Sequence, residues 1–209
     1  MEMSDQVELT NPVELSVGGM SGHILRRGIH LAMSFLPLLY FEFGEDVAEA
    51  VSLTLEQVVS AVILIAVVGE ALRLRMGWTI VGQRSYEAKQ VSALAWGALG
   101  VGMVFLLTPA PAYAYPLILS LSLGDPLLGE LRRKGVSTQT VIWAGTIGIA
   151  VIWAASAYWV DTPWLLVPLM APICVAAEWP RLRYIDDNAT MLLIPLAVVL
   201  VMNPFLGVI

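Results

Sequence analysis

Long apolar stretches alternate along the chain with short polar segments, and the apolar stretches approach the length of membrane-crossing helices. A helix needs roughly 20 mostly apolar residues to cross the hydrocarbon core of a bilayer. The pattern therefore predicts an all-α, polytopic membrane bundle of about seven transmembrane helices. The predicted spans are residues 24–40, 58–74, 91–107, the stretch from 112 to the basic cluster at 132–134, and residues 141–159, 164–177 and 189–202.

Glycine, proline and aromatic residues refine this prediction. Proline breaks the hydrogen-bond ladder of a helix, so Pro168, Pro172 and Pro195 predict that the last two spans are short or kinked. Small residues let helices approach closely, and aromatic residues favour the membrane interface. We expect the first role for Gly97, Gly100 and Gly102 and the second for Trp153, Tyr158 and Trp159.

The charges divide between the two sides that a seven-span layout predicts. All 11 lysines and arginines fall on the side of the N-terminus, whereas the connection at residues 42–56 on the opposite side is acidic and contains neither residue. Basic connections mark the cytoplasmic face of a membrane protein, so we expect a cytoplasmic N-terminus. The basic residues are Arg26, Arg27, Arg73, Arg75, Arg84, Lys89, Arg132, Arg133, Lys134, Arg181 and Arg183.

Composition agrees with a lipid environment and excludes several other classes. The 209 residues are 58% hydrophobic and 13% charged, whereas soluble domains are about 25% charged. One cysteine, Cys174, cannot form an internal disulfide and argues against cysteine-ligated zinc. The net charge of −6 argues against nucleic acid as a partner. We expect residues 1–20 to be a flexible acidic tail and residues 21–209 to form one transmembrane domain.

The segment of residues 120–135 carries the first candidate for chemistry. It places Asp125 within an apolar run, where a carboxylate costs roughly 2.5–3.5 kcal/mol on membrane-insertion scales. Arg132, Arg133 and Lys134 follow two helical turns later. Such a carboxylate indicates a functional site, and the alternative is an ion pair that only holds the bundle together.

Other polar groups fall on the same predicted face. They are Arg26, Arg27 and His30, the pair Glu70 and Arg73, and Glu178 with Asp186, Asp187 and Asn188. Carboxylate and amide oxygens suit Mg²⁺, which usually binds together with substrate phosphates, and cations bind the remaining phosphate oxygens. Each group also has a simpler interpretation: topology-setting charges, an ion pair within one helix, or a helix cap.

Taken in order, these residues resemble the CTP-dependent polyprenol kinases, which include dolichol and phytol kinases and are distantly similar to membrane cytidylyltransferases. One family element, KTxEG, is missing after Gly135, where the chain reads VSTQTVIWAG, and Arg133 or Lys134 would have to supply its cation. The residues that carry the resemblance are Arg26–Arg27–Gly28–Ile29–His30, Glu70–Ala71–Leu72–Arg73, Arg84 with Glu87, Gly124–Asp125–Pro126, Gly135, Glu178, Asp187–Asn188 and Pro195.

The resemblance implies a multi-pass membrane kinase with a cytoplasmic active site. It would transfer the γ-phosphate of CTP, or of another nucleotide, to an isoprenoid alcohol with the help of Mg²⁺. Two alternatives are a cytidylyltransferase that makes a CDP-lipid and a small ion-coupled transporter. The implied roles are metal binding by Asp125, Asp186, Asp187 and Asn188, proton acceptance by Asp125 or Asp187, phosphate contact by Arg26, Arg27, Arg73, Arg132, Arg133 and Lys134, and orientation of the phosphates by His30 and Glu178.

Overall fold

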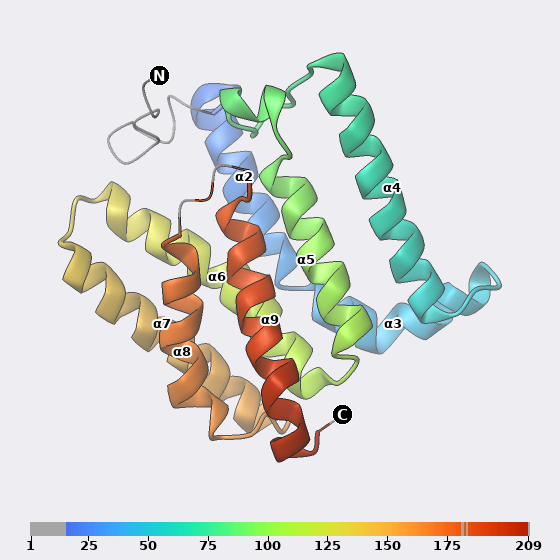
Figure 1. Cartoon of the computed structure of the whole chain (residues 1–209), viewed down its shortest axis with the longest axis vertical. Helices are drawn as coiled ribbons and strands as arrows, with labels where there is room; N and C mark the ends of the chain where they lie inside the picture. Colours follow the sequence, from blue (N-terminus) through green and yellow to red (C-terminus); the bar gives the residue numbers. More distant parts are fainter. Residues whose placement is uncertain (1–15, 181, 183, 209) are drawn as a thin grey trace.

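The structure is a computed structural model that describes residues 16–180, 182 and 184–208, and these residues form a bundle of helices (Figure 1). The all-α prediction is confirmed for this part of the chain. The α-helices are α2 (Gly19–Met33), α3 (Leu36–Ala50), α4 (Leu55–Met76), α5 (Ala93–Leu107), α6 (Pro111–Arg133), α7 (Thr138–Trp159), α8 (Leu166–Glu178) and α9 (Asp187–Leu206), and a short 3-10 helix, η1, covers Ser85–Lys89.

The helices α5 to α9 form the centre of the bundle. Helix α6 packs against α7, α8 packs against α7 and α9, and α9 packs against α5. Helix α4 lies outside α5, and α2 lies against α6. In Figure 1 α4, α6 and α8 end, and α5 and α9 begin, toward the upper side of the bundle, which we call the site end.

Three helices, α4, α7 and α9, are long and apolar enough to cross a membrane, and α5 and α8 are shorter apolar helices. Helix α4 begins with a capping box between Thr54 and Gln57 and ends at Gly77, which adopts a left-handed conformation. Only 6% of its apolar stretch is buried. A helix that is apolar on nearly all sides and barely covered by protein fits a lipid environment.

The first predicted span, residues 24–40, is divided into two helices. Helix α2 ends at Met33, and α3 begins at Leu36 with Pro37 in its first turn, where the missing N–H of proline costs no hydrogen bond. Helix α3 then runs across the bundle toward the beginning of α4 (Figure 1). It carries four of the five acidic residues of the predicted connection at 42–56, and the fifth, Glu56, lies in the first turn of α4.

Helix α8 is short, as predicted, with 13 residues, whereas α9, with 20 residues, is not short, and both helices continue through their prolines. Pro172 lies inside a continuous α8, and Pro195 and Pro204 lie inside α9, which extends beyond the predicted 189–202. In a bundle, packing by neighbouring helices holds a helix together even where one backbone hydrogen bond is missing. Helix α8 is held by α7 and α9 in this way.

Two of the three glycines predicted to allow close helix packing have that role. A Cβ atom at Gly100 would lie 2.8 Å from Leu192 of α9, and one at Gly102 would lie 2.5 Å from Ile63 of α4. Gly97 instead borders the cavity described below. The aromatic prediction is wrong for Trp153, which is buried in the core and donates from Nε1 to Ser120 Oγ over 2.9 Å.

The last part of the predicted tail belongs to the folded structure. Val17 N donates to Gln83 O over 2.8 Å, and Gly82 N donates to Val17 O over 3.0 Å. The segment therefore pairs with the connection between α4 and α5 before α2 begins at Gly19. Residues 1–15 of the predicted tail lie outside the described residues.

Candidate functional site

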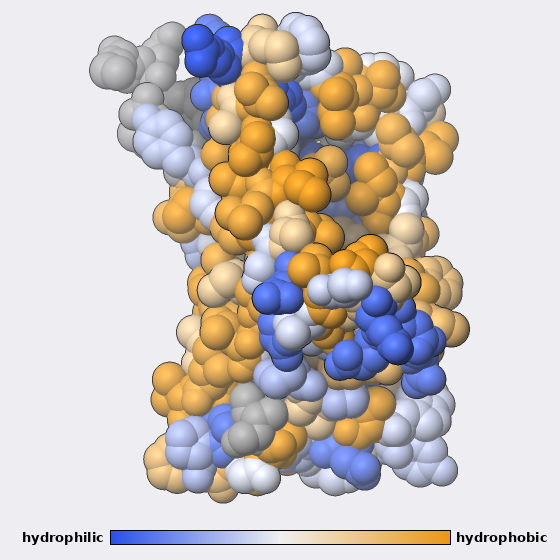
Figure 2. Space-filling model, turned by 90° about the vertical axis from the view of Figure 1, so that its right-hand side faces the viewer, coloured by the Kyte–Doolittle hydropathy of each residue, from blue (hydrophilic) through white to orange (hydrophobic). Residues whose placement is uncertain are grey.

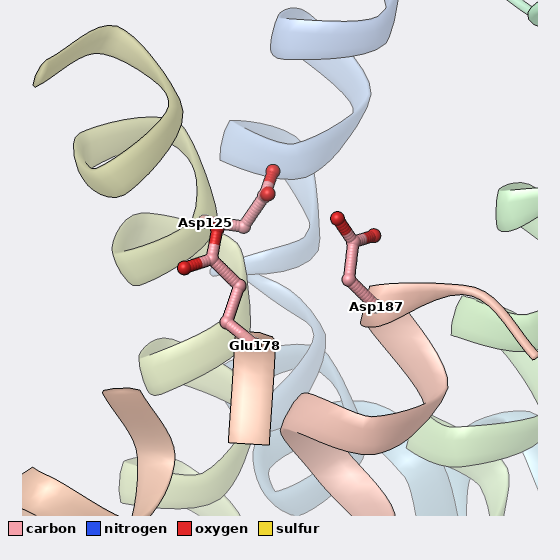
Figure 3. Close-up of side chains that lie close together, drawn as sticks. All are labelled: Asp125, Glu178 and Asp187. Carbon is pink, nitrogen blue, oxygen red and sulfur yellow. The ribbon is translucent and has the colours of Figure 1, made fainter. Parts of the chain in front are cut away.

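Three carboxylates from three helices converge at the site end (Figure 3). Asp125 comes from α6, Glu178 from the last residue of α8 and Asp187 from the first residue of α9. Carboxylate oxygens of the three residues all lie within 4.8 Å of one another. We call this group the carboxylate cluster. It unites residues that the sequence predicted for one site.

Several oxygens in and beside the cluster are buried without a hydrogen-bond partner among the described residues. They are Glu178 Oε2, Asp187 Oδ1 and Asn188 Oδ1. A buried acceptor without a partner costs roughly 1–3 kcal/mol, and more when it is charged. Glu178 also stands at the C-terminal end of a helix, where the helix dipole disfavours an anion. A bound cation would relieve both penalties.

Cationic side chains surround the cluster. Arg27 Nη1 of α2 donates to Asp125 Oδ2 over 3.0 Å. His30 Nδ1 lies 3.2 Å from the same oxygen, although the two atoms are not aligned for a hydrogen bond. Arg132 pairs with Glu178 and lies over the ring of Trp179. These contacts follow the predicted grouping.

A second network joins the cluster to the connection between α4 and α5. Arg26 Nη1 lies 3.2 Å from Glu87 Oε1, and the Glu87 side chain is buried and also accepts from the backbone N–H groups of Arg84 and Ala93. Asn188 Nδ2 donates to Ala93 O over 3.1 Å. Glu87 was not among the predicted site residues, although its position after Arg84 is part of the family resemblance.

Arg73 has a role different from the predicted phosphate contact. Its guanidinium donates to both oxygens of Glu70 and to the carbonyl oxygens of Trp78, Glu87 and Gln90. Its hydrogen bonds therefore tie the end of α4 to the connection that follows. This arrangement positions Glu87 for its contact with Arg26.

Two predicted phosphate-binding cations, Arg133 and Lys134, lie away from the carboxylate cluster, and Asp186 lies beside it. Arg133 pairs with Glu130 on the surface, and Lys134 is exposed at the end of α6. Asp186 caps α9, where its side chain accepts from Asn188 N over 3.1 Å. Burial and the adjacent Asp187 carboxylate raise the pKa of Asp186 well above its ordinary value.

An apolar cavity of about 510 Å³ adjoins the site on the α2 side. Its walls come from α2, α3, α4 and α5, and Arg26, His30, Glu87 and Asn188 form its polar end. Figure 2 looks at the molecule from the α4 side, where hydrophobic side chains dominate the upper half. The site thus combines a carboxylate cluster with a hydrophobic space of a size typical for small ligands.

Comparisons with protein-family models, with curated proteins and with solved structures find no match for this chain.

Proposed function

We propose that the chain is an integral membrane kinase that transfers the γ-phosphate of a nucleotide, CTP by its family resemblance, to the hydroxyl group of an isoprenoid alcohol. The observation that carries this proposal is the carboxylate cluster beside the polar end of an apolar cavity. The cluster suits metal–phosphate chemistry, and the cavity suits a lipid acceptor. The site end would face the cytoplasm, where nucleotide is available.

The cluster fits Mg²⁺ through its donor set. Asp125, Glu178 and Asp187 offer carboxylate oxygens, which are the hard ligands that this ion prefers. When bound, the ion neutralises charge on the transferred phosphoryl group. Such neutralisation is needed because Arg27 and Arg132 are already paired with carboxylates, so the site alone would repel a triphosphate.

The remaining residues of the site have roles in the proposed reaction. The hydroxyl oxygen of the alcohol attacks the γ-phosphorus, the bond from that phosphorus to the bridging oxygen breaks, and the nucleoside diphosphate leaves. His30 borders the cavity and lies against Asp125, so it accepts the hydroxyl proton while Asp125 stabilises the imidazolium. Arg26, Arg27 and Arg132 orient the phosphates at the margin of the cluster.

The two alternatives are less well supported by the same geometry. A cytidylyltransferase would use the same cluster but release pyrophosphate and form a CDP-lipid. A transporter needs polar groups along a path through the membrane, whereas the carboxylates of the cluster gather at one end of the bundle.

The test is an assay of the purified chain in lipid nanodiscs with Mg²⁺, γ-labelled CTP or ATP, and a panel of prenols. We expect label in the lipid phase and none after Asp125→Asn, with helical content unchanged. Asp46→Asn is the matched control, because Asp46 is exposed on α3 at a distance from the cluster, and it should retain activity. Pyrophosphate among the products would favour the cytidylyltransferase, and absence of any nucleotide turnover would refute both enzymes.

A further inference from the structure

We infer that the apolar cavity holds the hydrocarbon chain of a single-chain alcohol of three to four isoprene units, with its hydroxyl group at His30 and Asn188. This inference rests on the proposed function for the isoprenoid nature of the alcohol and for its role as phosphate acceptor. It adds the location and the length of the hydrocarbon chain of the alcohol.

The shape of the cavity indicates a chain that enters at one end. Its polar end lies near Ala93, and its other end lies at Phe105, which stacks on Tyr40 with ring centroids 4.1 Å apart. These two positions on α5 are about 18 Å apart at a rise of about 1.5 Å per residue. The space between them is bordered mainly by aliphatic side chains.

The volume sets how much of a hydrocarbon chain can lie inside the cavity. If each methylene takes about the 30 Å³ that a water molecule occupies in the liquid, 510 Å³ holds on the order of 15–20 carbon atoms. Three to four isoprene units match this number. A lipid with two long acyl chains exceeds it, and a long polyprenol would leave most of its chain outside.

The polar end favours a neutral hydroxyl group over an acid. Asn188 Oδ1 is a buried acceptor without a partner among the described residues, and an alcohol O–H can donate to it. A fatty-acid carboxylate at the same place would lie beside Glu87 and close to the carboxylate cluster, and like charges repel strongly where water is excluded. Arg26 offers little compensation because it is paired with Glu87.

The cavity is open on its side, which gives a lipid chain a route from the bilayer. Helix α4 packs on α5 and α3, whereas α2 packs on α6, so the cavity lies between α2 and α4. Leu39, Val62 and Leu94 border the cavity and are exposed. An acceptor can therefore approach through the membrane while nucleotide approaches from the aqueous side.

Binding of labelled geranylgeraniol to the full chain in nanodiscs, without nucleotide, tests this inference. Gly97→Leu places a side chain in the cavity and should weaken binding about tenfold or more, equivalent to about 1.4 kcal/mol or more. Gly69→Leu is the matched control, because Gly69 is exposed on α4 and a Cβ there meets no atom within 4 Å. Val62→Trp, at a position already exposed, narrows the cavity from the opposite wall without disturbing the core.

The inference is overturned if both cavity variants bind geranylgeraniol like the unmodified chain, or if palmitate or a long polyprenol binds equally well. Phosphorylation measured on the same samples separates this outcome from failure of the kinase. If the cavity variants lose binding and the unmodified chain phosphorylates no prenol, the cavity assignment is supported and the kinase is refuted. Phosphorylation with the same preference for prenol length in all variants supports the kinase and refutes the cavity assignment.

Discussion

The charge of Asp125 is tolerated inside the bundle because a guanidinium reaches it from another helix. Arg27 extends from α2 across α6, and its path passes over Gly129, one turn beyond Asp125. Any side chain at Gly129 would occupy the place of the Arg27 guanidinium. Gly129 is therefore needed to place Arg27 against Asp125.

Gly129→Ala should therefore impair the proposed reaction without unfolding the protein. A methyl group displaces Arg27 from Asp125, and a misplacement of about 1 Å in a catalytic group can cost on the order of 100-fold in rate. We expect a fall of about 10- to 100-fold in phosphorylation, measured with saturating prenol. Gly28→Ala on α2 is the control, since a Cβ there meets no atom within 4 Å. Equal activity of the two variants would contradict this role for Gly129.

Residue-level prediction from sequence succeeded where chemistry restricts the choice. A carboxylate in an apolar run must find a partner, and this requirement led to Asp125. The predicted seven-span layout and the family resemblance then grouped it with Asp187 and Glu178. The sequence could not show which cations serve them. Arg132 and Arg133 are adjacent, yet one turns toward Glu178 and the other toward Glu130 on the surface, because a step of one residue turns a helix by about 100°.

At the level of elements, two Glu-x-x-Arg pairs show how burial decides the contribution of an ion pair. Glu70 and Arg73 are 11% and 9% exposed, and Arg73 also binds three backbone carbonyls of the connection between α4 and α5. Glu130 and Arg133 are 39% and 45% exposed. The first pair holds an element in place, and the second is largely solvated.

Arg73→Met should consequently destabilise the protein by roughly 3–5 kcal/mol, because it removes the cation paired with the largely buried Glu70 carboxylate and the donor to three backbone carbonyls. Arg133→Met should change stability by only about 0–1 kcal/mol. Thermal unfolding in detergent, followed by circular dichroism, compares the two variants directly. Similar midpoints for both would show that the connection does not depend on Arg73.

The helices were predictable from apolar stretches, but their boundaries depended on tertiary contacts. Nothing in residues 24–40 separates a straight helix from the turn at Ser34, since a proline at position 37 fits the beginning of a new helix as well as a kink. Pro172 predicted a break in the helix, but α8 continues through it because α8 packs against α7 and α9. The cavity was not predicted. It arises because α2 and α4 lie apart, and the sequence gives no indication of the distance between these two helices.

Among the described residues, lysines and arginines gather at the site end, which also carries the carboxylate cluster, whereas the end of the bundle where α3 meets α4 carries acidic residues and no lysine or arginine. Lys134 lies at the end of α6, whereas the acidic residues of α3 precede the beginning of α4. If the apolar helices cross a membrane, the basic end should face the cytoplasm. The proposed kinase requires this orientation, because nucleotide must reach the cluster from that side.

Cysteine labelling in intact cells tests the orientation. In a Cys174→Ala background, which removes the one native cysteine, Glu49→Cys marks the end of α3 and Lys134→Cys marks the site end, and both parent residues are exposed. A membrane-impermeant maleimide should modify Glu49→Cys in intact cells and Lys134→Cys only after lysis. The reverse pattern would put the carboxylate cluster outside the cell and remove the nucleotide supply of the proposed kinase. Modification of both positions in intact cells would show that no bilayer separates them, so the apolar surface of α4 would need another explanation.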